Sequence, residues 1–377
     1  MREAKAIISS GEPEPYFGMG YTLSVLDKFF GQNERLVISL NAPAYDIKNG
    51  RERLLSIPLP NLPTFVPGRL ISDIRTAQII RVIKKFRPTH LLVRSGGRIA
   101  YRILSGLKHY HLNTLVVCAN VFQSKSKAEK KFHSLLINEL NENHVRLVGN
   151  HRWPATQSMI DVGLAPKKAV AWDWPGQKKA EDFPVRYFPE NNRFEILYVG
   201  AIIKEKGVDD LIEAIEIIRK TDQRFMLKII GDGADFHKHM ANFRDSHSIA
   251  FLGRLSNDQV FEQMCKTTLI VVPSRHSFSE GFPLTLTEAL ASRTPVIVSD
   301  HPVMLRSLID REGVRFFRAA DPSHLAQVIK EVMANPGHYN LLSETTANAL
   351  SRVECKYYFG DLLNAWKASF DYEPKVS

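Results

Sequence analysis

Short apolar runs alternate with longer amphipathic stretches along most of this 377-residue chain. Apolar runs of about four to eight residues are typical of buried strands, and the stretches between them have helical spacing. Such alternation predicts an α/β fold, in which parallel strands are connected by helices that cover both faces of the sheet.

The alternation divides the chain into two halves. In the first half we expect strands at 5–9, 35–40, 90–94, 114–118 and 145–149 and helices at 21–30, 69–86, 99–109, 129–141 and 154–163. Residues 172–192 break the pattern with Trp, Pro, Gly and charged residues, as an interdomain linker does. In the second half we expect strands at 194–199, 225–230, 249–252, 268–272 and 295–299 and helices at 208–219, 236–243, 257–265 and 284–291. This length fits two domains, which we place at 1–172 and 193–352, with a linker at 173–192 and a final helical segment at 353–377.

The stretch Ser274–Pro302 carries recognisable chemistry. It places two carboxylates, Glu280 and Glu288, around a turn between an apolar strand and a helix that begins near Pro283. A helix N-terminus presents unpaired N–H groups and a positive dipole end, which can hold a diphosphate. A carboxylate one or two turns further can accept hydrogen bonds from the two hydroxyls of a ribose. The stretch therefore has the parts that a nucleotide-sugar site requires.

The motif Glu280-x7-Glu288 resembles the signature of retaining glycosyltransferases of family 4, which have the GT-B fold. The resemblance is specific over about residues 195–333 and weaker before them. It implies two Rossmann-like domains facing a cleft, with a C-terminal helix, here within 353–370, that crosses back to the N-terminal domain. Five further blocks follow the family's order: Tyr198-Val199-Gly200, Lys206-Gly207-Val208-Asp209-Asp210-Leu211-Ile212, Ile230-Gly231-Asp232-Gly233, Phe251-Leu252-Gly253 and Val271-Val272-Pro273-Ser274.

The implied reaction is retaining transfer of a sugar from a UDP- or GDP-linked donor. Negative charge builds on the leaving diphosphate, and fixed positive charge with N–H dipoles can stabilise it. The sequence contains no Asp-x-Asp, which fits a metal-independent site, and we expect no cofactor. By resemblance, Lys206 contacts the diphosphate, Glu288 binds the ribose, and Glu280 lies at the transferred sugar or the diphosphate, as a nucleophile or a binding group. The backbone N–H groups expected to face the phosphates are those of Gly281, Phe282 and Leu284.

The chain departs from the family at Ala201, where members commonly have an arginine that also binds the diphosphate. Loss of one buried charge-assisted hydrogen bond costs a few kcal/mol unless another cation replaces it. Lys204 and Arg254 are the two candidates for this replacement. The missing arginine leaves a second function open, that of a catalytically impaired partner subunit which binds a nucleotide sugar.

Candidates outside the main motif are less specific. Gly18 and Gly20 form a glycine turn before a helix, near donor phosphate or acceptor, and Gly233 forms a tight strand-to-helix turn that lines the cleft. Asn120 replaces a histidine common in the family, and it can hydrogen-bond a sugar hydroxyl but cannot transfer a proton as imidazole does. Arg98 can hold an anionic acceptor, although a solvated arginine explains it equally well.

Positive charge is concentrated in the first half of the chain. Residues 1–190 hold 28 Lys and Arg against 16 Asp and Glu, whereas residues 191–377 hold 22 against 24. This asymmetry indicates an anionic membrane surface or an acidic acceptor, and a solvated basic face explains it equally well. No nucleic-acid-binding signature accompanies the charge, so we expect no nucleic-acid partner. The basic residues gather at Arg69, Arg75, Arg81, Lys84, Lys85 and Arg87 and at Lys125, Lys127, Lys130 and Lys131.

Composition favours a cytoplasmic enzyme. No apolar run approaches 18 residues, the length of a membrane-spanning helix, and the first residues lack the features of a signal peptide. The three cysteines, Cys118, Cys265 and Cys355, have no metal or redox spacing and are expected to be reduced. The family resemblance and the basic first half together imply a glycosyltransferase that acts on a glycan or lipid-linked acceptor in surface polysaccharide biosynthesis, in the cytoplasm or peripherally at the inner face of the membrane.

Overall fold

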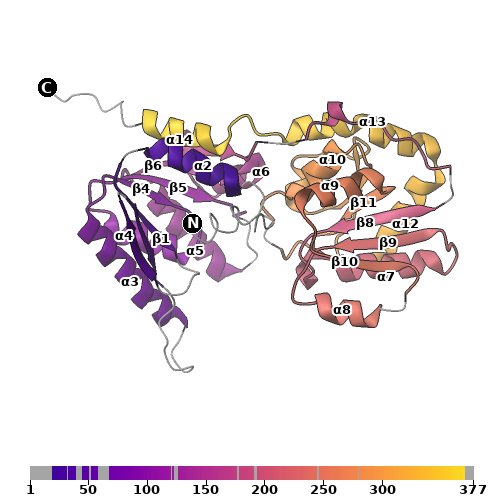
Figure 1. Cartoon of the computed structure of the whole chain (residues 1–377), viewed down its shortest axis with the longest axis horizontal. Helices are drawn as coiled ribbons and strands as arrows, with labels where there is room; N and C mark the ends of the chain where they lie inside the picture. Colours follow the sequence, from indigo (N-terminus) through magenta and orange to yellow (C-terminus); the bar gives the residue numbers. More distant parts are fainter. Residues whose placement is uncertain are drawn as a thin grey trace. The chain divides into compact units, whose positions relative to one another are not determined.

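The computed structural model describes residues 19–31, 33–39, 45–50, 52–57, 68–119, 121–122, 126–175, 178–190, 193–243, 246–278 and 280–369. The chain forms two compact units (Figure 1). One unit contains Met1–Pro175 together with Cys355–Ser377, and the other contains Gly176–Glu354. Each unit is an α/β structure with its own sheet and core.

The N-terminal unit contains a four-stranded parallel sheet in the order β4-β5-β6-β7. A second sheet has the order β1-β3-β2, and its β2–β3 pair is antiparallel. The sequence analysis missed β2, β3 and β7, because strands of four or five residues carry too little apolar pattern to be recognised. The strands are β1 (Arg35–Ser39), β2 (Tyr45–Asn49), β3 (Glu52–Ser56), β4 (His90–Val93), β5 (Asn113–Cys118), β6 (Val145–His151) and β7 (Ala169–Trp172). The helices are α2 (Met19–Phe30), α3 (Gly68–Phe86), α4 (Arg98–Leu107), α5 (Lys127–Leu140) and α6 (Arg152–Asp161), with a 3-10 turn η1 (Pro166–Lys168).

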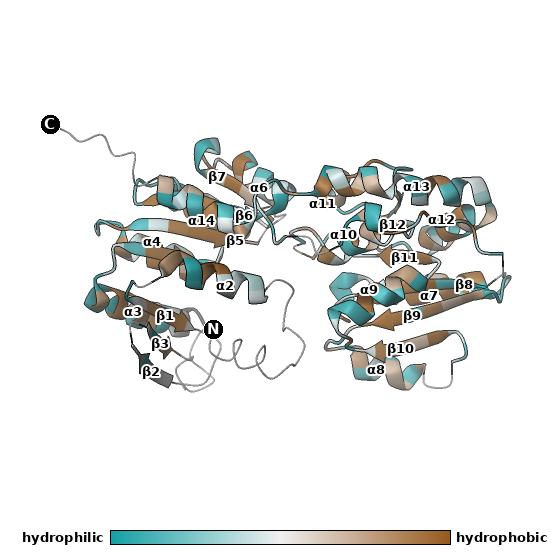
Figure 2. Ribbon diagram, turned by 45° about the horizontal axis from the view of Figure 1, so that its top comes forward, coloured by the Kyte–Doolittle hydropathy of each residue, from teal (hydrophilic) through white to brown (hydrophobic). Residues whose placement is uncertain are grey.

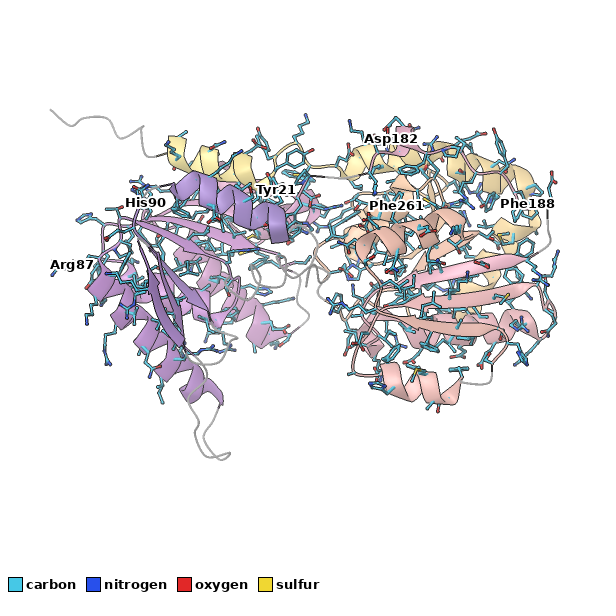
Figure 3. All side chains as sticks on the ribbon, in the orientation of Figure 1. Tyr21, Arg87, His90, Asp182, Phe188 and Phe261 are labelled. Atoms are coloured by element: carbon cyan, nitrogen blue, oxygen red, sulfur yellow. The ribbon has the colours of Figure 1, made fainter. Side chains whose placement is uncertain are left out.

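A helix from the last part of the chain completes the core of this unit. Helix α14 (Phe359–Ala368) lies beside α2, and Tyr21, labelled in Figure 3, accepts a hydrogen bond at its hydroxyl from the Gly360 N–H, 3.3 Å away. Four α14 side chains have no exposed surface and pack with residues of α2, β5 and β7. They are Phe359, Leu362, Leu363 and Trp366.

The C-terminal helix expected within 353–370 is present as α14 but begins only at Phe359, because residues 354–358 separate it from α13 (Pro336–Val353). Here Asp173 forms an isolated parallel bridge with Tyr358. Its N–H donates to the Tyr357 carbonyl, and its own carbonyl accepts from the Phe359 N–H. This tertiary pairing takes up backbone groups that a continuous helix would need, and Asp361 then caps α14 by accepting the Tyr358 N–H.

The C-terminal unit contains a six-stranded parallel sheet in the order β10-β9-β8-β11-β12-β13. Strand order reverses at β8, which has β9 on one side and β11 on the other. The strands are β8 (Phe194–Val199), β9 (Phe225–Ile230), β10 (Ile249–Gly253), β11 (Leu269–Val272), β12 (Val296–Ser299) and β13 (Val314–Phe317). The helices are α7 (Val208–Arg219), α8 (Phe236–Asn242), α9 (Asn257–Lys266), α10 (Leu284–Ala291), α11 (Pro302–Leu305), α12 (Pro322–Ala334) and α13, with 3-10 turns η2 (Ala180–Asp182) and η3 (Lys204–Lys206).

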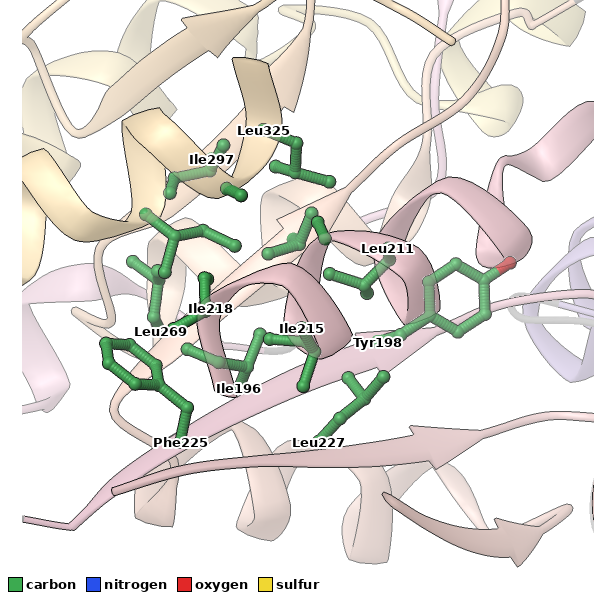
Figure 4. Close-up of a cluster of buried hydrophobic side chains, with 14 of the residues drawn as sticks. Ile196, Tyr198, Leu211, Ile215, Ile218, Phe225, Leu227, Leu269, Ile297 and Leu325 are labelled. Carbon is green, nitrogen blue, oxygen red and sulfur yellow. The ribbon is translucent and has the colours of Figure 1, made fainter. Parts of the chain in front are cut away.

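Aliphatic side chains of α7 and α12 and the central strands form the main core of this unit (Figure 4). Figure 2 shows β8 and β9 as largely hydrophobic ribbons, as expected for strands that are covered on both faces. Phe188, labelled in Figure 3, extends the core by an edge-to-face contact with Tyr339 of α13, with ring centroids 5.7 Å apart. This rigid sheet fixes the loops that follow its strands.

Candidate functional site

The candidate site lies where strand order reverses, at the carboxyl ends of β8 and β11. In open parallel α/β sheets, ligands bind in the crevice outside the strand ends at this switch point. The loops here are joined to one another by hydrogen bonds. The Thr285 hydroxyl of α10 donates to the Val199 carbonyl at 3.4 Å, and the hydroxyl of Ser299, the last residue of β12, donates to the Ser274 carbonyl at 2.6 Å.

Two glycines allow these loops to approach closely. Gly207 has a left-handed φ of 72°, and a Cβ there would lie 2.1 Å from the carbonyl oxygen of Pro273. A Cβ on Gly233 would lie 2.3 Å from the Ile202 carbonyl oxygen, and the Gly233 N–H donates to the Asp232 side chain at 2.7 Å. Any other residue at either position forces backbone to move. The role of Gly233 is thus to bring the loop after β9 against the loop after β8.

Lys206 and Glu280 form an ion pair at this place. The Lys206 ammonium nitrogen lies 2.5 Å from Oε2 of Glu280 and 4.2 Å from the centroid of the Phe278 ring. The carboxylate also accepts the Ser274 hydroxyl at 3.1 Å. Glu280 is 6% exposed, so its charge requires these partners. The structure thus brings together the two residues that the sequence analysis placed at the centre of catalysis.

Tyr198 supports the loop that contains Ala201. Its hydroxyl donates to the Ala201 carbonyl at 2.7 Å. Burial, with a further contribution from the charge of Glu280, raises the pKa of Tyr198 well above its usual range. The tyrosine therefore stays protonated and keeps donating this hydrogen bond, which fixes the backbone at the end of β8.

A second ion pair holds the loop after β11 to the start of α7. The guanidinium of Arg275 makes two hydrogen bonds to the Asp210 carboxylate, at 2.8 and 2.6 Å, and the Arg275 N–H donates to the Glu205 carbonyl at 2.9 Å. Asp210 is 4% exposed. Hydrogen bonding to Asp210 raises the pKa of Arg275 against the effect of its burial. This clamp places η3, which contains Lys206, beside the loop that contains Glu280.

Helix α10 begins at Leu284, with Pro283 as its N-cap. The helix therefore begins one residue after Pro283, near which the sequence analysis expected it to begin. Phe282 is buried, and Gly281, Leu284 and Glu288 are half-buried. Glu288 is therefore less buried than the apolar sequence of the helix indicated, since the buried face of α10 is formed by Leu286 and Ala289–Ala291.

The two cations proposed to replace the missing arginine are both exposed. Lys204 lies in η3, and Arg254 follows β10. Ala201 is also exposed. The Lys204 and Arg254 side chains are thus accessible to a ligand.

The candidates in the N-terminal unit are not brought together by any contact that the structure records. Gly20 lies in the first turn of α2. Arg98 is the first residue of α4 and is exposed, with its guanidinium carbon 5.3 Å from the centroid of the Phe132 ring. Gly18 and Asn120 lie outside the described residues.

The sequence analysis missed two groups of buried polar side chains. Asp173, in the predicted linker, binds Nε2 of His151 at 2.9 Å and the Arg152 guanidinium at 2.8 Å. Burial opposes ionisation of Asp173, but the hydrogen bond from His151 and the charge of Arg152 outweigh it and lower its pKa. The other group surrounds His301, at the end of β12. In both cases the sequence feature that could have indicated the group was a polar residue close to the end of an apolar strand.

Within the described ranges, no group of three or more His, Cys, Asp or Glu side chains is arranged to hold a metal ion. None of the helices in the described part of the chain combines the length and apolar character needed to span a membrane.

Comparison with known proteins agrees with this site. Residues 179–349 match the family model of glycosyl transferases group 1. An uncharacterized glycosyltransferase of Methanocaldococcus jannaschii is 37% identical over 142 residues, which are 37% of this chain and 38% of that protein. The lipopolysaccharide core biosynthesis mannosyltransferase LpcC of Rhizobium leguminosarum is 33% identical over 169 residues, covering 42% of this chain and 45% of that protein. The crystal structure of Anabaena HepE in complex with UDP has a TM-score of 0.59 at 13% identity, covering 84% of this chain and 85% of HepE.

The family match lies within the Gly176–Glu354 unit and supports a group 1 glycosyltransferase. The likeness to HepE confirms the expected fold class, an α/β structure with parallel sheets like those of GT-B glycosyltransferases. The chain spans only 38% of the length of the M. jannaschii relative.

Proposed function

We propose that this chain is a retaining, metal-independent glycosyltransferase of the family 4 type. It transfers a sugar from a UDP- or GDP-linked donor, bound by the C-terminal unit, to an acceptor bound by the N-terminal unit. The observation that supports this most is the Lys206–Glu280 pair, with 2.5 Å between its charged atoms, at the strand-order switch point.

The donor diphosphate binds beside η3 and the first turn of α10. Lys206 exchanges part of its contact with Glu280 for the phosphate oxygens, and the N–H groups of Gly281, Phe282 and Leu284 contribute dipoles. These groups are fixed before the reaction, so they stabilise the charge that develops on the leaving diphosphate. Glu288 accepts hydrogen bonds from the ribose hydroxyls, and Lys204 or Arg254 provides the second cation.

For Glu280 we propose a binding role rather than a nucleophilic one. Its Oε2 accepts hydrogen bonds from both Lys206 and Ser274. Two donors on one oxygen stabilise the carboxylate and thereby reduce its nucleophilicity. The carboxylate accepts hydrogen bonds from hydroxyls of the transferred sugar, which fixes the anomeric carbon against the acceptor.

The proposed acceptor is a glycan or a lipid-linked glycan in surface polysaccharide biosynthesis. LpcC, whose name describes a lipopolysaccharide core mannosyltransferase, supports this class. Gly18, Gly20, Asn120 and Arg98 remain its candidate contacts. The basic first half of the chain fits peripheral contact with an anionic membrane at the cytoplasmic face.

Nucleotide release from a panel of UDP- and GDP-sugars tests the proposal, with and without EDTA. We expect slow donor hydrolysis that EDTA does not change, and retention of anomeric configuration in the product. A folded protein that binds no nucleoside diphosphate and releases none from any donor would refute it.

Ala201 supports one alternative, a partner subunit that binds nucleotide sugar without turning it over. The exposed alanine at this place provides no charge to the diphosphate. Calorimetry separates the two functions, because a partner subunit binds the nucleoside diphosphate but shows no turnover until a second glycosyltransferase is added.

A further inference from the structure

His301 is a buried histidine that the proposed donor chemistry does not use. It follows β12, is 3% exposed, and lies at the N-cap of α11. Its Nδ1 accepts the Val303 N–H at 3.3 Å, and its Nε2 lies 3.0 Å from the Phe278 carbonyl oxygen. An amide N–H can only donate, so Nδ1 carries no proton and Nε2–H donates to Phe278.

This tautomer agrees with the electrostatics around the ring. Burial lowers the pKa of His301, and it outweighs the opposite effects of the Phe278 carbonyl and the charge of Glu280. The imidazole is therefore neutral at neutral pH. Both of its nitrogens have a partner in this state, which is the condition for a polar ring to remain buried.

The Phe278 peptide connects His301 to both proposed catalytic side chains. Its carbonyl oxygen accepts a second hydrogen bond, from the Glu280 N–H at 3.0 Å. The centroid of the Phe278 ring lies 4.2 Å from the Lys206 ammonium, in a cation–π contact. One residue thus contacts the backbone of Glu280 through its carbonyl and the charge of Lys206 through its ring, and His301 binds the same carbonyl from the loop after β12.

Helix capping alone does not explain this residue. A cap requires only an acceptor for the Val303 N–H, which Ser, Asp or Asn provides with less volume to bury. The second hydrogen bond joins residues 23 positions apart in sequence and reaches the loop from the neighbouring strand end. Helix capping therefore leaves the hydrogen bond from Nε2–H to the Phe278 carbonyl unexplained.

We propose that His301 is a positioning residue, which holds the Phe278 turn and through it sets Glu280 and Lys206 in the geometry for sugar transfer. The proposal rests on the proposed function of the Lys206–Glu280 pair. It assigns the residue no contact with substrate.

Two substitutions separate the two hydrogen bonds. In His301→Asn the amide oxygen can still accept the Val303 N–H, but the side chain is too short to reach Phe278. In His301→Gln the amide N–H can reach the Phe278 carbonyl in place of Nε2–H. His247→Asn, in an exposed loop, is the matched control for loss of a histidine.

We expect His301→Asn to lower kcat by about 10- to 100-fold, since misplacement by about 1 Å can cost 10²-fold, with a smaller change in the donor KM. His301→Gln should recover most of kcat, and His247→Asn should match the wild type. Wild-type turnover in His301→Asn, or equal losses in the Asn and Gln variants, would overturn the proposal.

Two measurements on ligand-free protein do not depend on activity. Nitrogen NMR of labelled histidine should show His301 protonated at Nε2, and a proton on Nδ1 would contradict the proposal. Acetic anhydride labelling, followed by mass spectrometry, should modify Lys206 faster in His301→Asn than in the wild type or His301→Gln, with Lys204 as the internal reference. Unchanged Lys206 labelling in His301→Asn also overturns the proposal. If no donor releases nucleotide, the proposed function fails, and these two measurements alone decide the role of His301.

Discussion

Replacement of Lys206 by alanine should lower both turnover and the free energy of unfolding, in a protein that still folds. Among the described residues, the Lys206 ammonium is the one positively charged group that forms an ion pair with Glu280 within 4 Å. Its side chain is 18% exposed, so the contact is only partly screened by solvent. Loss of one preorganised donor at a developing oxyanion costs about 3 kcal/mol, or about 10²-fold in kcat.

The same substitution leaves the Glu280 carboxylate buried with Ser274 as its remaining recorded donor. Breaking a buried ion pair by removal of one partner costs about 3–5 kcal/mol, and we expect the lower end because Lys206 is partly exposed. The double variant Lys206→Ala, Glu280→Ala should regain part of this stability, since it removes the unpaired charge. A double-mutant cycle in urea measures the coupling free energy.

The matched control is Lys204→Ala, two residues away in η3 and exposed. Steady-state nucleotide release and urea denaturation on the wild type, Lys206→Ala, Glu280→Ala, the double variant and Lys204→Ala give the two quantities separately. If Lys206→Ala and Lys204→Ala lose the same small fraction of kcat, Lys206 does not stabilise the leaving diphosphate. If the double variant loses more free energy of unfolding than the two single variants lose together, the ion-pair interpretation is wrong.

Three further predictions concern other parts of the chain. Glu288→Ala should weaken binding of the free nucleoside diphosphate and of the donor together, by about tenfold or more as for loss of a charged hydrogen bond, and unchanged calorimetric affinity in a folded variant would exclude the ribose contact. Burial lowers the pKa of His144 below the usual 6.5, so on acidification the unfolded chain binds a proton at this histidine before the folded protein does. Stability is therefore lost as pH falls through about 6.5, and the wild type should lose more thermal stability between pH 8 and pH 5 than His144→Gln. The protein should sediment with anionic vesicles at low salt and be released at high salt, because each Lys or Arg near the surface contributes roughly 1 kcal/mol that salt screens, and recovery in the supernatant at low salt would leave the basic half as a solvated face.

The sequence predicted regular elements well where apolar periodicity was strong. Helices at 208–219 and 284–291 and strands at 194–199 and 225–230 have the predicted bounds. Each is an element of the C-terminal core whose apolar positions repeat with a single period. The family resemblance also assigned Lys206 and Glu280 to one site, and the structure places them in contact.

Pairing between loops could not be predicted in this way. His301 and Phe278 belong to different loops, and no local pattern indicates that a histidine ring will meet a particular carbonyl. The interruption at 354–358 has the same origin, since the helix stops where Asp173, far away in sequence, pairs with the backbone. The half-burial of Glu288 depends on which face of α10 meets α13, and that choice is made by tertiary packing.

The route of the chain through its two units has a consequence for synthesis. The Gly176–Glu354 unit is continuous, so it can fold as soon as its last strands and helices have left the ribosome. The other unit begins first, yet Trp172 and Leu115 lack their partners until Phe359–Trp366 emerge. Although residues 19–175 are translated earlier, their apolar sheet face must wait for the whole C-terminal unit to be made. During that interval this face stays without part of its apolar core, and the Gly176–Glu354 unit is the first part of the protein that can complete its own core.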